Sequence, residues 1–404
     1  MWNKIGHFLG VKRDLVGLMA MAIFVGLGER MAERFLPIYI LALGGGAVGV
    51  GLLNGLDNLL SALYSFPGGY IADRFGTKRA LLFFNLLAIS GYLVVIAFPS
   101  WWAVVAGSVL FLSWTAISLP ASMKLIASVL PQNKRAMGVT MHSLVRRIPM
   151  ALGPVIGGTM IGIFGEVEGV RAAFVCATVF VLVALAAQQK LIRPDDEGTM
   201  IARPERNPLA VWREMPAGLR NLLASDILIR FAEQIPYAFV VVWCMKVIEA
   251  PVSALQFGVL TTVEMVVAML VYIPVAWLAD RGGKKACVAI TFVFFTLFPL
   301  VLMISRSFGA LVLAFVVRGL KEFGEPTRKS LIIDLSTENR EASMFGLYYL
   351  IRDTVVSVGA FGGAFLWKVS PVLNLWTAFV CGALGTAWFV LHGTDTAPEQ
   401  EPRS

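Results

Sequence analysis

GGYIADRFGTKR, at residues 68–79, is a polar stretch with four charged residues that directly follows an apolar run. A second stretch, VAWLADRGGKK at residues 275–285, has nearly the same pattern. The aspartates of the two copies, Asp73 and Asp280, are 207 positions apart, about half of the chain. A polar turn that recurs at this distance indicates that the chain contains a duplicated unit.

The composition is that of a membrane protein. Of the 404 residues, 57% are hydrophobic and 15% are charged, whereas soluble domains carry about 25% charged residues. A run of roughly 20 apolar residues crosses the bilayer core as a helix. The sequence predicts an all-α polytopic membrane protein with 12 transmembrane helices in two pseudo-symmetric six-helix bundles. The expected spans are 15–42, 48–72, 80–98, 101–130, 137–164, 171–190, 221–248, 254–279, 286–304, 308–335, 342–368 and 372–392.

The polar stretch at residues 189–208 divides these spans into six and six. We therefore expect an N-terminal bundle at 1–190, a cytoplasmic linker at 191–220, and a C-terminal bundle with a short cytoplasmic tail at 221–404. Alternate loops carry nineteen Lys and Arg on one side and four on the other. Because the basic side is cytoplasmic, both termini should be cytoplasmic, and we expect a bacterial inner membrane. The net charge of +8 then reflects topology and not a nucleic acid partner.

Charged residues inside the spans repeat between the two halves. Asp57 and Glu264 are 207 positions apart, and Arg30–Glu33 corresponds to Arg230–Glu233 at a distance of 200. Arg146 and Arg352 are 206 positions apart. The constant order indicates a six-helix unit duplicated in parallel orientation. Transporters built in this way commonly bind substrate where the repeats meet, near the bilayer midplane.

These motifs resemble the Major Facilitator Superfamily over essentially the whole chain. The family signature between helices two and three is Gly-x-x-x-Asp-Arg-x-Gly-Arg-Lys/Arg, from which Thr77 departs. The matching residues are Gly69, Asp73, Arg74, Gly76, Lys78 and Arg79 in the first copy, and Asp280, Arg281, Gly283, Lys284 and Lys285 in the second. The resemblance implies a conformational latch that locks the outward-open state. The alternative is a solvated loop that only sets the topology.

A second resemblance lies in the fifth span, in ALGPVIGG at residues 151–158. Gly153, Pro154, Gly157 and Gly158 match a Gly-Pro-x-x-Gly-Gly signature of the superfamily's 12-helix drug/proton antiporter branch. Pro149 stands where that branch carries a further Gly. Small residues also permit close helix crossing, so simple packing is the alternative.

The intramembrane acids are the candidate proton carriers. Placing a charged residue in the bilayer costs free energy, so such a residue suggests a functional role. Arg30 and Glu33, like Arg230 and Glu233, can pair across one helical turn. The resemblance implies that the helices carrying both pairs line the substrate cavity, while Asp57 and Glu264 lie near the middle of their spans. An acid beside a cation can exchange its proton for substrate; the alternative is a permanent structural ion pair.

The tenth span carries charges at helical spacing. Arg318, Glu322, Glu325 and Lys329 form one stripe, and Lys321, Glu325 and Arg328 form an adjacent one. Gly324 and Pro326 can interrupt the helix. We expect Arg318 and Glu322 to line the cavity.

The repeat mates Arg146 and Arg352 have two possible roles. They can bind an anionic group bidentately, or neutralise Asp57 and Glu264, which we favour.

We expect a secondary transporter of a small organic solute that works by rocker-switch alternating access, and we favour proton-coupled export. Proton-coupled uptake or uniport of a polar or anionic metabolite is the alternative, and a non-transporting sensor lies outside this class. No Gly-x-x-x-x-Gly-Lys-Ser/Thr sequence is present for an ATP-driven pump. The three histidines are scattered, so we expect no enzyme activity, no metal and no cofactor. The expected partners are the substrate, protons and the lipid bilayer, with the chain as a monomer.

Overall fold

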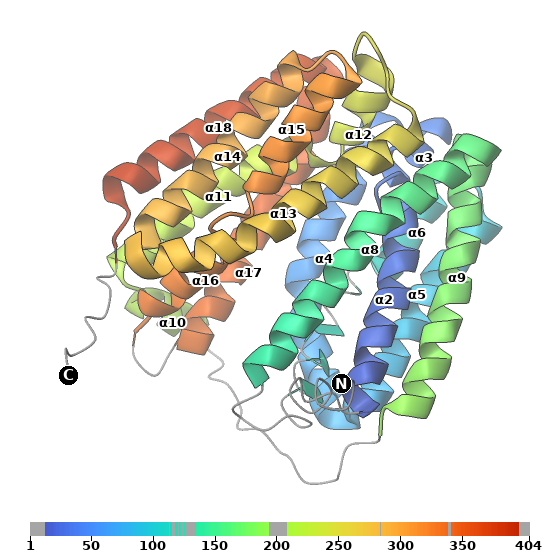
Figure 1. Ribbon diagram of the computed structural model, residues 1–404, viewed down its shortest axis with the longest axis horizontal. Coiled ribbons are helices and arrows are strands. Elements are labelled where there is room, and N and C mark those ends of the chain that lie inside the picture. Colours follow the sequence, from blue (N-terminus) through green and yellow to red (C-terminus); the bar gives the residue numbers. More distant parts are fainter. Residues whose placement is uncertain are drawn as a thin grey trace. The chain divides into compact units, whose positions relative to one another are not determined.

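The computed structural model describes residues 13–112, 114, 118–119, 121–122, 125–126, 135–193, 208–282, 284–337 and 341–395. Its regular elements within these residues are helices (Figure 1). The first group is α2 (Arg13–Glu33), α3 (Leu36–Ala42), α4 (Gly46–Phe75), α5 (Thr77–Ala97), α6 (Trp101–Phe111), α8 (Arg135–Phe164) and α9 (Glu166–Leu191). The second is α10 (Pro208–Glu214), α11 (Ala217–Tyr237), α12 (Val240–Val242), a π-helix (Trp243–Val247), α13 (Ala254–Gly282), α14 (Lys284–Ile304), α15 (Phe308–Leu320), α16 (Glu325–Asp334), α17 (Glu341–Val369) and α18 (Pro371–His392).

Each of the twelve expected spans overlaps with at least one of these helices. Within the described residues, eight helices are long and apolar enough to cross a membrane, or nine if one bent pair is a single span. That pair, α11 and the segment Val240–Val247, bends by 44° just after Pro236. Proline removes a backbone donor and commonly causes such a bend. The prediction of an all-α polytopic membrane protein is confirmed.

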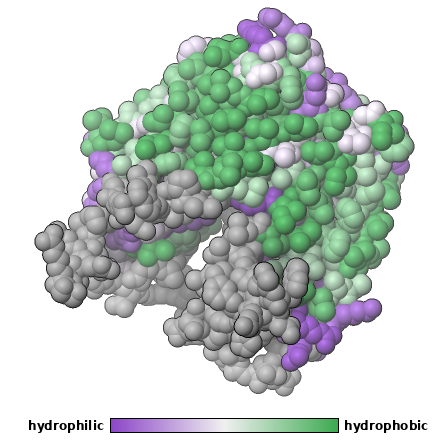
Figure 2. All heavy atoms as spheres, viewed as in Figure 1, coloured by the Kyte–Doolittle hydropathy of each residue, from purple (hydrophilic) through white to green (hydrophobic). Residues whose placement is uncertain are grey.

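The outer surface of the helices is apolar. Figure 2 shows hydrophobic side chains spread over the face in view, and leucines and valines such as Leu270, Val358 and Leu391 are more than 60% exposed. Such a surface is costly in water but is suited to lipid, where backbone groups must be satisfied within the helix.

The chain divides into two compact units. Unit 1 contains Met1–Ala202 together with Ser253–Thr262, and unit 2 contains Arg203–Val252 and Val263–Ser404. In unit 1, α2 packs against both α8 and α9. In unit 2, α11 packs against α17 and α18, and α14 packs against α18. The helices that carry the repeated charges, α2 and α11, therefore lie among other helices of their own unit.

Glycines bring α8 into backbone contact with its neighbours in unit 1. A Cβ atom on Gly157 would lie 1.9 Å from the Met31 carbonyl oxygen of α2, and one on Gly153 would lie 2.6 Å from Arg30 Cβ. A Cβ on Gly158 would lie 2.4 Å from the Ala254 carbonyl oxygen at the start of α13. Only residues without a side chain permit this approach. The signature in the fifth span thus lies at the closest helix crossings of α8.

Candidate functional site

A face of α11 carries three charged side chains in unit 2. Asp226, Arg230 and Glu233 follow each other at intervals of four and three residues, so they share one side of the helix. Arg230 Nη1 lies 2.6 Å from Glu233 Oε2, and its Nε lies 3.9 Å from Asp226 Oδ1. The Asp226 side chain is 1% exposed, so this face is directed into the unit.

The break between α15 and α16 supplies the second set of charges. α15 ends at Leu320, a turn covers 321–324, and α16 begins at Glu325. The break brings Lys321 and Glu325 to the α11 face: Lys321 Nζ lies 2.6 Å from Glu233 Oε1, and Arg230 pairs with Glu325. Arg328 pairs with Asp226 and places Nη2 2.7 Å from Glu325 Oε2.

α13 contributes Glu264, which is buried. Its Oε1 lies 3.2 Å from Arg318 Nε and 3.7 Å from Lys321 Nζ. Gly319 makes this possible, because a Cβ there would lie 2.6 Å from the Glu264 carbonyl oxygen. The Arg318 guanidinium also lies over aromatic rings, at 5.1 Å from the centre of Phe298. A guanidinium over a ring face gains about 0.5–2 kcal/mol.

α17 closes the network around Asp226. The Tyr348 hydroxyl donates to Asp226 Oδ2 over 2.9 Å, and Arg352 Nη1 lies 3.4 Å from the same oxygen. Arg352 Nε donates to Asp353 Oδ1 over 2.7 Å. Asp226 therefore links α11, α16 and α17.

We call this set the unit 2 charge network. It consists of Asp226, Glu233, Glu264, Glu325 and Asp353 with Arg230, Arg318, Lys321, Arg328 and Arg352. A single charged residue costs about 2.5–3.5 kcal/mol at the centre of a membrane helix on insertion scales. The balance of five acids and five cations offsets that cost, because each charge lies beside at least one of opposite sign. Removing one charge leaves a buried partner without compensation.

Unit 1 holds a sparser arrangement. Arg30 Nη1 lies 2.6 Å from Glu33 Oε2 in the last turn of α2. Asp57 interacts electrostatically with both, and it is half-buried on α4. Asn54, three residues before Asp57, lies on the same helical face. Among the described residues, Asp57 has no cation within the 4 Å of an ion pair.

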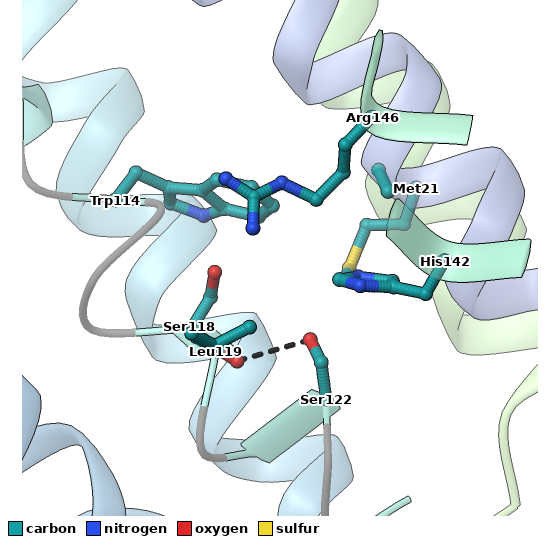
Figure 3. Close-up of a pocket in the computed structure, with 8 residues that line it drawn as sticks. Met21, Trp114, Ser118, Leu119, Ser122, His142 and Arg146 are labelled. Atoms are coloured by element: carbon teal, nitrogen blue, oxygen red, sulfur yellow. Dashed lines mark hydrogen bonds between the residues drawn. The ribbon is translucent and has the colours of Figure 1, made fainter. Parts of the chain in front are cut away.

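A pocket also lies in unit 1. Its lining consists of Met21, Ala22, Trp114, Ser118, Leu119, Ser122, His142 and Arg146. Figure 3 shows the Arg146 side chain extending from α8 toward the indole of Trp114, with the two serines below. The Trp114 Nε1 donates to Asn85 Oδ1 over 2.8 Å, and Asn85 Nδ2 donates to Gln188 Oε1 over 2.9 Å. These two hydrogen bonds fix the position of the indole.

A family model of the Major Facilitator Superfamily matches residues 18–249 and 222–404, which together cover nearly the whole chain. The chain belongs to the Major Facilitator Superfamily.

Individual relatives agree with this membership. An uncharacterized MFS-type transporter of Methanocaldococcus jannaschii is 20% identical over 376 residues, 86% of this chain and 87% of the relative. A Na(+), Li(+), K(+)/H(+) antiporter of Planococcus maritimus is 27% identical over 166 residues, 39% of this chain and 36% of the relative. A peptide transporter POT, solved in complex with sulfate, has a TM-score of 0.76 at 14% identity and covers 94% of both chains. At this identity the POT structure supports the fold alone.

The signature residues of the superfamily are only partly described. Gly76 has a φ of 83° between α4 and α5, a conformation that favours glycine. Lys78 Nζ donates to the Gln189 carbonyl oxygen over 2.9 Å, and Arg79 is exposed. Several signature residues lie outside the described part of the structure: Gly283 and the side chains of Asp73, Arg74, Asp280 and Arg281. Of Gly69, only its place in α4 is described. The latch stays a prediction.

The expectation that Arg146 and Arg352 neutralise Asp57 and Glu264 is corrected. Arg352 contacts Asp226 and Asp353, while Glu264 is paired with Arg318 and Lys321. Arg146 lies in the unit 1 pocket.

The charged neighbours of Asp57 are Glu29, Arg30 and Glu33 of α2, and Arg34, which directly follows α2. The repeat mates therefore do not neutralise Asp57 and Glu264.

Of the two expected stripes of the tenth span, the one formed by Lys321, Glu325 and Arg328 is buried. In the other stripe, Arg318 is buried beside Glu264, whereas Glu322 is half-buried and Lys329 is exposed.

Sequence reasoning missed Asp226. A signal was present, because Asp226 precedes Arg230 by one helical turn and continues the Arg230–Glu233 face. Its counterpart in the first half is not acidic, and the comparison of repeats therefore did not reveal it.

Proposed function

We propose that the chain is a proton-coupled secondary transporter that exports a small organic solute by alternating access. The observation that carries the proposal is the unit 2 charge network, in which buried acids and cations from α11, α13, α15, α16 and α17 share partners. A purely structural ion pair needs only two residues. In a network with shared partners, a cation can move from one carboxylate to another when the first carboxylate is protonated.

The chemistry of coupling follows from this sharing. A proton that binds a carboxylate removes its charge and releases the cation beside it. Breaking one side of a buried pair costs about 3–5 kcal/mol, which is enough to change which of two helix packings is more stable. Lys321 bridges Glu233 and Glu264, so protonation of either acid shifts the Lys321 contact to the other.

We propose Asp57 as the acid whose proton moves most freely. It is half-buried, and no described cation lies within ion-pair distance of its carboxylate, whereas Glu33 and Glu233 are each held at 2.6 Å by an arginine. Gain and loss of the Asp57 proton therefore require no ion pair to be broken. Its electrostatic link to Arg30 and Glu33 couples its charge to α2.

Export is the proposed direction. The Gly-Pro-x-x-Gly-Gly sequence of the antiporter branch is present in α8, and a relative named as a Na(+), Li(+), K(+)/H(+) antiporter matches part of the chain. The two Asp-Arg turns are proposed as the latch on the cytoplasmic side. We further propose a monomer in a bacterial inner membrane with both termini cytoplasmic, and bundles at 1–190 and 221–404 that rock about the linker at 191–220.

Proton movement in proteoliposomes tests the proposal. Tetraphenylphosphonium, indole-3-acetate and glycyl-glycine are added in turn to the wild type and to Glu33→Gln, Asp57→Asn and Glu233→Gln, while a pH-sensitive dye reports the lumen. We expect one compound to move protons in the wild type and not in Asp57→Asn. Glu168→Gln, which removes an exposed carboxylate of unit 1, is the matched control and should behave as the wild type. Proton movement that is the same in all variants would show that these carboxyls are structural.

A further inference from the structure

The unit 1 pocket combines one cation, two hydroxyls, the His142 imidazole and one aromatic face. Arg146 supplies the guanidinium, Ser118 and Ser122 the hydroxyls, and Trp114 the indole. We propose that this pocket binds the anionic group of the transported solute, and that the solute is an organic anion with a flat apolar part. This inference rests on the proposed transport function and adds its substrate class.

Arg146 differs from the arginines of the unit 2 charge network. Arg230, Arg318, Arg328 and Arg352 each have a carboxylate within 4 Å. Among the described residues, no carboxylate lies within that distance of Arg146. A guanidinium that faces a pocket without an internal partner can pair with an anion that enters.

The electrostatic surroundings of Arg146 add to this preference. The charged groups that act on it are Arg30 and Arg147, which are cations, and Glu29, which is an anion. Arg30 already forms an ion pair with Glu33 in α2. With Arg30 offset by Glu33 and Arg147 balanced by Glu29, the charge left in this set is that of Arg146, which attracts an anion and opposes a cation.

The hydroxyls and the indole lie on one helical face, because Trp114, Ser118 and Ser122 are spaced by four residues. Ser122 Oγ donates to the Ser118 carbonyl oxygen over 3.0 Å, which uses its one O–H donor, so the donors for an anionic group come from Arg146. The bond from Trp114 to Asn85 fixes the ring plane, so a flat apolar group can stack on it without ordering the ring. Met21 and Ala22 supply an apolar wall.

The size of the pocket limits what it holds. The enclosed space of the pocket is about 10 Å³, which is about that of one water molecule. It therefore receives one oxygen of a carboxylate, sulfonate or phosphonate group beside Arg146, while the apolar part of the solute lies at the open side of the pocket. Arginine binds such groups through two parallel N–H donors, which a neutral amide cannot match.

Binding of matched acids and amides tests the inference. Full-length protein in phosphatidylcholine nanodiscs is titrated calorimetrically with indole-3-acetate against indole-3-acetamide, and with 1-naphthoate against 1-naphthamide. Each pair differs in charge and hardly in shape. A hydrogen-bonded charge pair corresponds to a preference for the acid of about 10- to 100-fold, which we expect in the wild type.

Three variants assign the preference to one side chain. Arg146→Gln should reduce the preference for the acids to less than about 3-fold, and Arg146→Lys should keep part of it because the charge remains. Arg171→Gln removes a cation of the same unit that is already paired with Glu168 and should bind as the wild type. Elution volume and the thermal midpoint of each variant establish that it is folded.

Equal binding of acid and amide by the wild type, absence of binding of both acids, or an unchanged preference in folded Arg146→Gln would each overturn the inference. Its failure is separable from failure of the proposed function. If tetraphenylphosphonium drives proton movement while neither acid binds, the transport proposal stands and the anion assignment falls. If the acids bind through Arg146 and no compound moves protons, the anion assignment stands and the proposal of proton-coupled transport falls.

Discussion

At the scale of single residues, Asp226 is the point at which three helices of unit 2 meet. Arg328 of α16 and Tyr348 and Arg352 of α17 all contact its carboxylate. Asp226 and Arg328 are each 1% exposed, so neither charge can turn to water if the other is lost.

Asp226→Asn should therefore lower stability strongly. The amide has the same size but no charge, and it leaves Arg328 buried with only part of its compensation. A loss of about 3–5 kcal/mol in the free energy of unfolding is typical of a broken buried pair, and thermal denaturation in detergent micelles measures it as a lower midpoint. The control is Glu249→Gln, which removes one side of an exposed pair with Arg306 and should change the midpoint little. Equal midpoints for the two variants would contradict the role of Asp226.

The limits of sequence reasoning are clear at this scale. The pairs Arg30–Glu33 and Arg230–Glu233 follow from helical spacing, and the structure contains both. Contacts between helices do not follow from spacing, because they depend on how each helix is rotated and where it breaks. The partners of Arg352 and Glu264 were mispredicted for that reason.

At the scale of elements, the broken tenth span determines which charges are buried. Gly324 marks the break in the sequence, and its amide donates to Thr291 of α14. Helical spacing predicts that Lys321, Glu325 and Arg328 share one face, and this face is buried while Lys329 is exposed. Spacing does not predict which of the two adjacent stripes is buried, because that depends on how the segment is rotated against α11, where Lys321 meets Glu233.

The crossing of α2 and α8 should fail when a methyl group is added at Gly157. A Cβ there would lie 1.9 Å from the Met31 carbonyl oxygen, so the two helices must separate. Overpacking of this kind typically costs about 1–3 kcal/mol. We expect Gly157→Ala to lower the thermal midpoint.

Gly162→Ala is the matched control for this substitution. It lies on the same helix, and a Cβ there meets nothing within 4 Å, so its midpoint should equal or exceed that of the wild type. If both substitutions had the same small effect, the close crossing would be absent from the protein in solution.

At the scale of the whole molecule, the duplicated turn in the sequence was sufficient to predict the superfamily and its fold. The arrangement of the charges in alternate loops further predicts an orientation in the membrane. It places Arg193, after α9, in the cytoplasm and Glu249, before α13, outside, since basic loops remain inside.

Labelling in cells tests this orientation. The four native cysteines are replaced by serine, and Glu249→Cys or Arg193→Cys is introduced at exposed positions. A membrane-impermeant maleimide should label Glu249→Cys in intact cells and Arg193→Cys only after permeabilisation. The opposite pattern would invert the topology and place both Asp-Arg turns outside.

The central claim is that proton movement through the carboxyl groups of the chain drives transport of the solute. The most direct measurement is uphill transport into proteoliposomes of the compound that the dye assay selects, under a pH gradient imposed across the membrane. The account predicts that the wild type accumulates the compound against its own gradient while the pH gradient lasts. It also predicts that Asp57→Asn exchanges labelled for unlabelled compound but does not accumulate it. Accumulation by Asp57→Asn equal to that of the wild type, or accumulation that persists after nigericin collapses the pH gradient, would contradict the account.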